Sequence, residues 1–303
     1  MRPAVHGIHH VTGIVRDGQS NVDFYSDALG LRFVKRTVDF EDRFSYHLHY
    51  GDATGSAGSV LTFFPFLDEA DGRVGRPQIA STALAVPDQS LDYWRSRLED
   101  RGAVVGSIDR RFDERALSVH DPDGTHIELV AGTGHAEPWD GSVPPEHGIR
   151  GVAGVSVLSA SPYITASILE TFGFTRGGQD GTRVRYRTGR GVVDILDRDT
   201  EYGREGAGTI HHVAFGVDDV DALHAWRETL AGRDDVRVSY VHDRDYYHSL
   251  YVRDAGGILF ELATEPIEMT AGDPSPGEHL YLPSQFEEDR ETIESQLPRI
   301  ELP

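Results

Sequence analysis

Two pairs of adjacent histidines, His9-His10 and His211-His212, are the first residues of this chain that could support chemistry. Each pair stands in nearly the same phrase, GIHHVTGIVRD near the start and TIHHVAFGVDD far along the chain. Imidazole nitrogens bind transition metals and move protons near neutral pH. The repeated phrase indicates a duplicated structural unit.

The pattern around each pair is typical of a β-strand, in which neighbouring side chains point to opposite faces. His212 shares its face with Ala214 and Gly216, whereas His211 shares its face with bulky Val and Phe residues. The face of small side chains leaves space for a ligand. The pattern therefore predicts His212, and by register His10, as cavity residues. The first histidine of each pair is then expected on the face that packs against a helix.

The run LFELAT surrounds Glu261 with apolar residues, and a buried carboxylate needs a partner. A cation would be a suitable partner. Two histidines and one carboxylate form the facial ligand set of non-haem Fe(II) oxygenases, which leaves coordination positions open, and Mn(II) also accepts such ligands. We therefore predict a metal site made of His10, His212 and Glu261, with Fe(II) as the metal and Mn(II) as the alternative.

The corresponding positions in the rest of the chain differ in their chemistry. Ser81 and Gly154 stand where the cavity histidines are expected, and Thr62 stands where Glu261 is expected. Glu128 matches Glu261, but no histidine accompanies it on its own first strand. The sequence thus offers three ligands and no evident fourth.

Three further histidines have no assigned role. His47 and His49 share one face of a predicted strand in FSYHLHYGD, where they could line a pocket or form an ordinary polar face. His248 lies in a motif near Glu261 and stays unassigned.

The candidate residues belong to a unit of strand, helix and about three strands that occurs four times. QIASTALAVPD (78–88) and GVAGVSVLSAS (151–161) are weaker copies of the histidine phrases. Amphipathic segments that predict helices follow at 21–30, 90–102, 164–173 and 219–232. The last strand of each unit is predicted within 58–66, 123–131, 191–199 and 256–264. A repeat of this kind determines the fold class.

The domain organisation follows from the repeats. Residues 132–148, rich in Gly and Pro, are typical of a linker. We predict an N-terminal pair of modules at 1–135 and a C-terminal pair at 149–265. A tail, 266–303, carries a short helix in EEDRETIESQL.

The composition excludes several functions. The net charge of −21 disfavours nucleic acid and anionic membranes as partners, and the absence of Cys excludes disulfides and thiolate chemistry. No apolar run is long enough for a membrane helix and the N-terminus lacks a signal peptide's apolar core, so we expect a cytoplasmic protein. Lys35 is the only lysine, and such acidic, lysine-poor chains are similar to proteins of salt-loving microbes.

Four βαβββ modules resemble the vicinal oxygen chelate superfamily, which includes glyoxalases, bleomycin resistance proteins and extradiol dioxygenases. The resemblance implies an α+β fold in which paired modules form two open β-barrel-like domains. It also implies that modules one and four together form the metal cavity, and that modules two and three pair with each other. A homodimer is a further expectation for this superfamily.

The segment DRDYYHSLYVRDAGGILFELAT (243–264) is more specific. Together with IHHVT, FSYHLHYGD, LTFFPF and the tail LPSQFEEDRETIESQLP, it resembles the ring-cleaving dioxygenases that act on hydroquinones. Carried over position by position, the resemblance implies the metal ligands His10, His212 and Glu261. It implies outer-shell or substrate-pocket roles for His9, Thr12, His211, Arg244 and Tyr251. This disagrees with the packing face predicted above for His9 and His211.

The expected function is a metal-dependent dioxygenase that cleaves the ring of a hydroquinone or catechol-like diol with O2, in aromatic degradation. Tyr251 would bind the phenolate or transfer protons, and Arg244 would stabilise anionic charge. A glyoxalase-type lyase or isomerase is the alternative, but such sites use four protein ligands, and Thr62 is a poor fourth. A drug-binding protein of the same fold would lack the ligand set altogether.

Overall fold

The computed structural model describes residues 4–265 and 277–303. Module one consists of β1 (Ile8–Val15), α1 (Gly18–Val22) with a π-helical continuation (Asp23–Ala28), β2 (Arg32–Val38), β3 (Tyr46–Gly51) and β4 (Val60–Pro65). Module two consists of β5 (Gln78–Val86), α2 (Leu91–Asp100), β6 (Val104–Arg111), β7 (Glu114–His120) and β8 (His126–Ala131). Module three consists of β9 (Val152–Leu158), α3 (Pro162–Thr171), β10 (Thr175–Asp180), β11 (Arg183–Thr188) and β12 (Gly191–Leu196). Module four consists of β13 (Thr209–Val217), α4 (Val220–Ala231), β14 (Val236–Asp243), β15 (His248–Asp254) and β16 (Leu259–Thr264).

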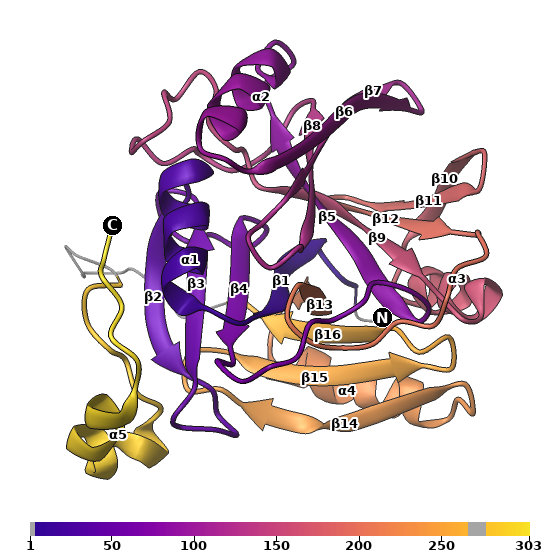
Figure 1. Cartoon of the computed structure of the whole chain (residues 1–303). Coiled ribbons are helices and arrows are strands. Elements are labelled where there is room, and N and C mark those ends of the chain that lie inside the picture. Colours follow the sequence, from indigo (N-terminus) through magenta and orange to yellow (C-terminus); the bar gives the residue numbers. More distant parts are fainter. Residues whose placement is uncertain (1–3, 266–276) are drawn as a thin grey trace.

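The strands of the described residues form one open sheet of sixteen strands (Figure 1). In every module the first strand pairs in parallel with the last, as β1 does with β4 and β13 with β16. Between modules, β1 pairs antiparallel with β13, and β5 pairs antiparallel with β9. The predicted α+β fold of four βαβββ modules is therefore confirmed. The division into domains at 1–135 and 149–265 stays a prediction.

The helices lie on the outer sides of the curved sheet (Figure 1). The predicted segments 90–102 and 219–232 contain α2 and α4, whereas α1 and α3 begin two or three residues before the predicted segments 21–30 and 164–173, and most of 21–30 is the π-helical continuation. In α2 and α4 a buried Trp, Trp94 or Trp226, stands between two buried leucines at spacings of three and four. The N-terminus of α4 is capped by Asp219, whose carboxylate accepts a hydrogen bond from the Ala222 amide at 2.8 Å. The helices α2 and α4 therefore bury the same kinds of side chain at the same spacing.

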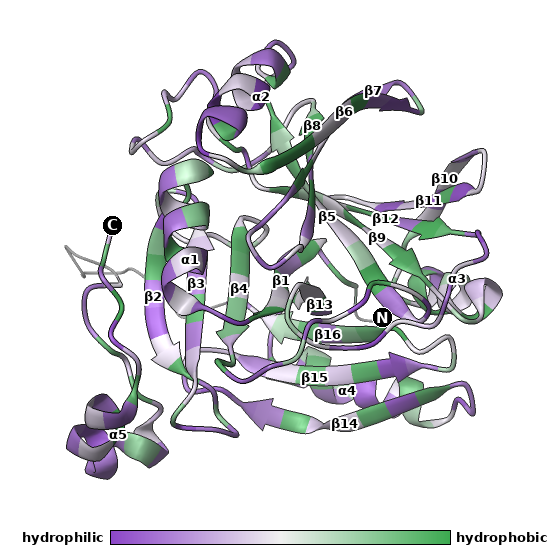
Figure 2. Cartoon of the chain, in the orientation of Figure 1, coloured by the Kyte–Doolittle hydropathy of each residue, from purple (hydrophilic) through white to green (hydrophobic). Residues whose placement is uncertain are grey.

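Apolar residues concentrate along the inner strands, among them β1, β4, β9 and β16, while α5 at the C-terminus is largely hydrophilic (Figure 2). Most of the buried apolar side chains form a single cluster that includes residues of all four modules. The central strands are therefore rigidly held, which suits them to carry a site of defined geometry.

The predicted linker, 132–148, forms neither helix nor strand. The predicted terminal helix is present as α5 (Arg290–Gln296), after a 3-10 segment (Ser284–Asp289). Part of the predicted tail, 266–276, lies outside the described residues. No helix in the described ranges is long and apolar enough to cross a membrane.

Lys35 is buried on β2 and lies beside the functional region. Burial lowers its pKa to about 7, although Asp245 opposes this effect. Its ammonium nitrogen lies 3.0 Å from the centroid of the Tyr246 ring, and its Cα pairs with that of His49. The single lysine of the chain is thus held by a ring contact, without an ion pair among the described residues.

We expect Lys35→Met to stabilise the fold at pH 6 and to lose this advantage as the pH rises. Between the folded pKa of about 7 and the unfolded value of 10.5, the unfolded chain binds the extra proton, so wild-type stability rises with pH across this window. Because each pKa unit corresponds to about 1.4 kcal/mol, a gain above about 1 kcal/mol is expected at pH 6. Urea unfolding at pH 6 and pH 10 measures it. Lys35→Arg is the control that keeps the charge, and a gain independent of pH would contradict the prediction.

Candidate metal centre

Three side chains from three neighbouring strands meet at the middle of the sheet. His10 lies on β1, His212 on β13 and Glu261 on β16, and all three are buried. The Glu261 Oε2 atom lies 2.7 Å from His212 Nε2 and 3.5 Å from His10 Nε2, and the two Nε2 atoms are 3.4 Å apart. The structure thus brings together the three predicted metal ligands, with one ligand atom of each within 4.8 Å of the others.

The pairing of β1 with β13 sets the direction of both histidine pairs. Ile8 pairs with Phe215 and His10 with Ala214, so His9 is an extra residue in the ladder. The same happens on β13, where Thr12 pairs with His212 and Gly13 with Ile210, which leaves His211 without a partner. Each first histidine is therefore the residue of a β-bulge, and a bulge breaks the strict alternation of faces.

The bulges place His9 and His211 next to the ligands. The Nδ1 atoms of His9 and His10 are 2.8 Å apart, and those of His211 and His212 are 2.7 Å apart. This differs from the helix-packing face that the alternation predicted, and it matches the outer-shell place that the family resemblance implied. Burial lowers the pKa of His9 to about 3 and that of His211 to about 4, so both rings are neutral and each can accept a hydrogen bond at Nδ1 from the ring of its neighbour. The Nε2 atoms of His10 and His212 then face the centre.

The protonation state of the centre suits a metal. Burial lowers the pKa of His212, although Glu261 opposes this, so the ring is neutral at pH 7. Burial by itself disfavours a charged carboxylate, but the rings of His10 and His212 hold the pKa of Glu261 well below its usual range. Neither carboxylate oxygen makes a hydrogen bond of good geometry with any described residue, and Glu261 has no exposed surface. A buried, ionised carboxylate in this condition fits a bound cation.

Thr12 lies between the centre and the next strand. Its hydroxyl oxygen is 2.9 Å from His212 Nε2 and 2.8 Å from the Thr62 hydroxyl oxygen. The Thr62 hydroxyl is thus engaged with Thr12. Among the described residues, no fourth His, Cys, Asp or Glu joins the three candidate ligands.

Arg244 and Tyr251 line the same cavity as the ligands. The Tyr251 ring meets that of His212 edge to face at 5.6 Å, and its hydroxyl lies 3.4 Å from Arg244 Nη2. Burial, reinforced by the charge of Glu261, raises the pKa of Tyr251, so the phenol keeps its proton. The Arg244 guanidinium makes no ion pair with the described residues and lies 5.1 Å from the centroid of the Phe40 ring.

Several cavity residues escaped the sequence analysis. Besides the predicted residues and His47, for which a place in a pocket wall was one of two alternatives, the walls include Asp39, Phe40, Phe64, Tyr246 and Tyr247. The Tyr246-Tyr247 pair stands in the quoted motif DRDYYHSLY, so that motif was the available signal. His47 is in the cavity wall, and the His49 ring lies 4.1 Å from it, tilted by 46°. His248 lies outside the cavity, 3.8 Å from Asp243.

Comparisons with known proteins agree with this arrangement. The family described as the glyoxalase/bleomycin resistance protein/dioxygenase superfamily matches residues 7–129. The Bacillus subtilis (strain 168) protein named "Putative ring-cleaving dioxygenase MhqO" is 39% identical over 299 residues, 96% of this chain and 95% of its own length. The chlorohydroquinone/hydroquinone 1,2-dioxygenase of Sphingobium indicum is 32% identical over 271 residues, 85% of this chain and 84% of its own.

A solved structure extends the similarity to three dimensions. The crystal structure described as a "putative dioxygenase" of Bacillus subtilis subsp. subtilis str. 168 is 37% identical, with a TM-score of 0.94 and coverage of 99% of both chains. Fold and site define a protein built of βαβββ modules around a cluster of two histidines and one glutamate. The chain belongs to the glyoxalase/bleomycin resistance protein/dioxygenase superfamily, and its relatives in that superfamily include proteins named ring-cleaving dioxygenases.

The ligand set predicts how substitutions change metal content. His212→Ala and Glu261→Gln should each lower the bound metal of protein purified after chelation and Fe(II) loading, because each removes one of three ligands. We expect a loss of at least about tenfold in affinity. Elemental analysis of the purified protein measures the metal content. His248→Ala, outside the cavity, is the control, and Glu261→Gln protein with a full complement of metal would contradict the assignment.

Proposed function

We propose that the chain is a metal-dependent dioxygenase that cleaves the ring of a hydroquinone or catechol-like diol with O2. The observation that carries the proposal is the buried cluster of His10, His212 and Glu261, whose two histidines line a cavity together with Tyr251 and Arg244. Relatives named ring-cleaving dioxygenases, which align with most of the chain, support it. A cytoplasmic location and a homodimer stay predictions.

The donor set favours Fe(II), with Mn(II) as the alternative. His10, His212 and Glu261 would hold the metal, which when bound supplies open positions for the diol and O2 and a route for electrons between them. His9 and His211, through their Nδ1 atoms, keep the ligand rings oriented. Burial of all three ligands excludes water from this chemistry.

Tyr251 and Arg244 would act on the organic substrate. The Tyr251 phenol keeps its proton because of burial, so it can donate a hydrogen bond to a substrate oxygen and supply a proton as the ring opens. The unpaired Arg244 guanidinium can stabilise negative charge that develops on the same oxygen. Aromatic walls from Phe40, Phe64 and Tyr247 suit a flat ring.

His47 is a candidate for contact with a second substrate oxygen. It is 7% exposed, lines the cavity, and makes no hydrogen bond with any described residue. It lies on β3, two strands from β1, which corresponds to about 10 Å at the usual strand spacing. A ring oxygen para to the oxygen at the metal could therefore approach it. Phe64, stacked on His47 at 4.3 Å, holds the imidazole in place.

A lyase or isomerase of the glyoxalase type is less well supported. Such a reaction needs a fourth protein ligand or a base at the metal, and the Thr62 hydroxyl is engaged with Thr12 instead. The relatives that align with most of this chain carry dioxygenase names.

Oxygen uptake tests the proposal. With Fe(II) loaded anaerobically, a panel of hydroquinones and catechols should give uptake at an oxygen electrode that metal-free protein and His212→Ala lack. Tyr251→Phe should lower kcat by about 10²- to 10⁴-fold, the usual range for a lost acid or base. Uptake should also be greater in molar NaCl, where screening offsets the net charge of −21, if the acidic surface is an adaptation to salt. Absence of oxygen uptake with every diol, despite one bound metal per chain, would contradict the proposal.

The His47 contact predicts a change in substrate preference. His47→Phe keeps a flat ring but removes the polar atoms, so kcat/KM for hydroquinone should fall by about tenfold while that for catechol holds, as for one lost hydrogen bond. Steady-state kinetics with both diols measure the ratio, and His248→Phe is the control outside the cavity. An equal loss for both diols would show that His47 only supports packing.

A further inference from the structure

Modules two and three form a second hollow that mirrors the metal cavity. In the metal half, Glu261 on β16 pairs with Ala214 on β13, and in the other half Glu128 on β8 pairs with Ala83 on β5. The ladder between β5 and β9 also has two shifts, which leave Ala80 and Ala153 as extra residues. The hollow has a volume of about 590 Å³, within the usual range for small-molecule sites.

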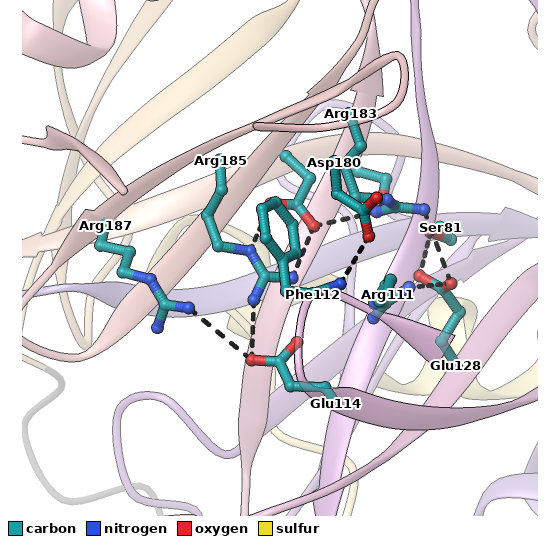
Figure 3. Close-up of polar contacts among 11 residues, drawn as sticks. Ser81, Arg111, Phe112, Glu114, Glu128, Asp180, Arg183, Arg185 and Arg187 are labelled. Carbon is teal, nitrogen blue, oxygen red and sulfur yellow. Dashed lines mark hydrogen bonds and ion pairs between the residues drawn. The ribbon is translucent and has the colours of Figure 1, made fainter. Parts of the chain in front are cut away.

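Guanidinium groups of Arg111 and Arg183 lie at the Glu128 carboxylate, the counterpart of Glu261 (Figure 3). Glu128 accepts a hydrogen bond from the Ser81 hydroxyl at 2.8 Å and forms an ion pair with Arg111. Arg183 lies 4.0 Å from the same carboxylate and donates to Asp194 at 2.9 Å. The carboxylate that corresponds to Glu261 is thus neutralised by arginine, so this half does not call for a metal.

The hydrogen-bonding capacity of the hollow is unbalanced. Its three carboxylates all have donors, since Asp109 accepts from the Ser107 hydroxyl, Asp180 from the Phe112 amide, and Glu128 as above. Its donors are in excess. These include Arg110 and Arg198, two exposed residues of the lining whose guanidinium groups make no hydrogen bond or ion pair within the described ranges and are therefore open to a ligand from solvent.

A buried donor, the Nε–H group of Arg111, also lacks an acceptor among the described residues. The Arg111 side chain is 11% exposed, and its Nε–H has no acceptor although Nη1 is paired with Glu128. The His120 ring, also in the wall, stacks on the ring of His126 at 4.8 Å. A buried donor without an acceptor is costly, and an acceptor that enters from solvent would remove the cost.

We propose that this hollow binds a small oxyanion, a carboxylate or a phosphate, between Arg110, Arg111 and Arg198. Arginine donates two parallel hydrogen bonds to either group, which gives it geometric specificity for them. The site is unusual in a chain with a net charge of −21, where most of the surface repels anions. The inference does not rest on the proposed function. If that function holds, its product falls in the same class, because cleavage between two ring carbons leaves a carboxylate.

Calorimetric titration of the full, metal-free chain tests the site, with cis,cis-muconate as the organic dicarboxylate and inorganic phosphate as the second probe. We expect one site per chain, and affinity at least about tenfold lower in the Arg110→Ala, Arg198→Ala double variant. The matched control, Arg237→Ala with Arg299→Ala, removes the same charge from exposed arginines outside the hollow and should bind as wild type does.

The outcomes distinguish the two classes of ligand, and they distinguish a failure of the anion site from a failure of the proposed function. Saturable binding of muconate alone identifies organic carboxylates, and binding of phosphate alone identifies phosphoryl compounds. The site is refuted if neither probe binds saturably, if the control loses as much affinity as the double variant, or if His212→Ala removes the binding. Because the titration needs neither metal nor turnover, it is independent of the outcome of the oxygen-uptake assay.

Discussion

The antiparallel pairing of β1 with β13 is the contact on which the functional region depends. It brings His10 and His212, 202 positions apart in the chain, to an Nε2–Nε2 distance of 3.4 Å. The parallel pairing of β13 with β16 adds Glu261 from the next strand. Strands in the middle of a sheet are fixed on both sides by backbone hydrogen bonds and on both faces by packing, so a cluster built on them has little freedom to relax. That rigidity keeps the buried carboxylate of Glu261 and the two imidazole rings of His10 and His212 together.

Two bulges refine this arrangement. A regular ladder would turn His9 and His211 away from the ligands, whereas the extra residue in each strand leaves their Nδ1 atoms 2.7 to 2.8 Å from those of His10 and His212. The cost is one unpaired position in each strand. The same shifts occur at Ala80 and Ala153 in the other half, where no histidine uses them. The bulges are therefore a property of the module. In the half with the candidate metal centre, the bulge residues are His9 and His211, which contact the candidate ligands.

The two halves share one backbone arrangement but surround the buried carboxylate with different partners. Glu261 and Glu128 stand at matching register positions, but the first faces two imidazoles and the second faces Ser81 and Arg111. Replacement of a cation by guanidinium groups satisfies the carboxylate without creating an open coordination site. Arg110 and Arg198, which line the hollow of that half, then favour anions, in contrast to the net negative charge of the whole chain.

The sequence by itself determined the modules and indicated the candidate ligand set, because both depend on local periodicity and on residue type. The repeated phrase marked both strands, and an acid among apolar residues marked Glu261. Only the tertiary structure decided the direction of His9 and His211, since a bulge is defined by the register between two strands from distant parts of the chain. It also decided the walls of the cavity, where Phe40 and Tyr246 come from loops of modules one and four, and the convergence of Arg110 and Arg198 from modules two and three. The motif DRDYYHSLY marked Tyr246 as a residue of interest, but the placement of such loop and hairpin positions beside one another follows from long-range packing, which a local pattern does not specify.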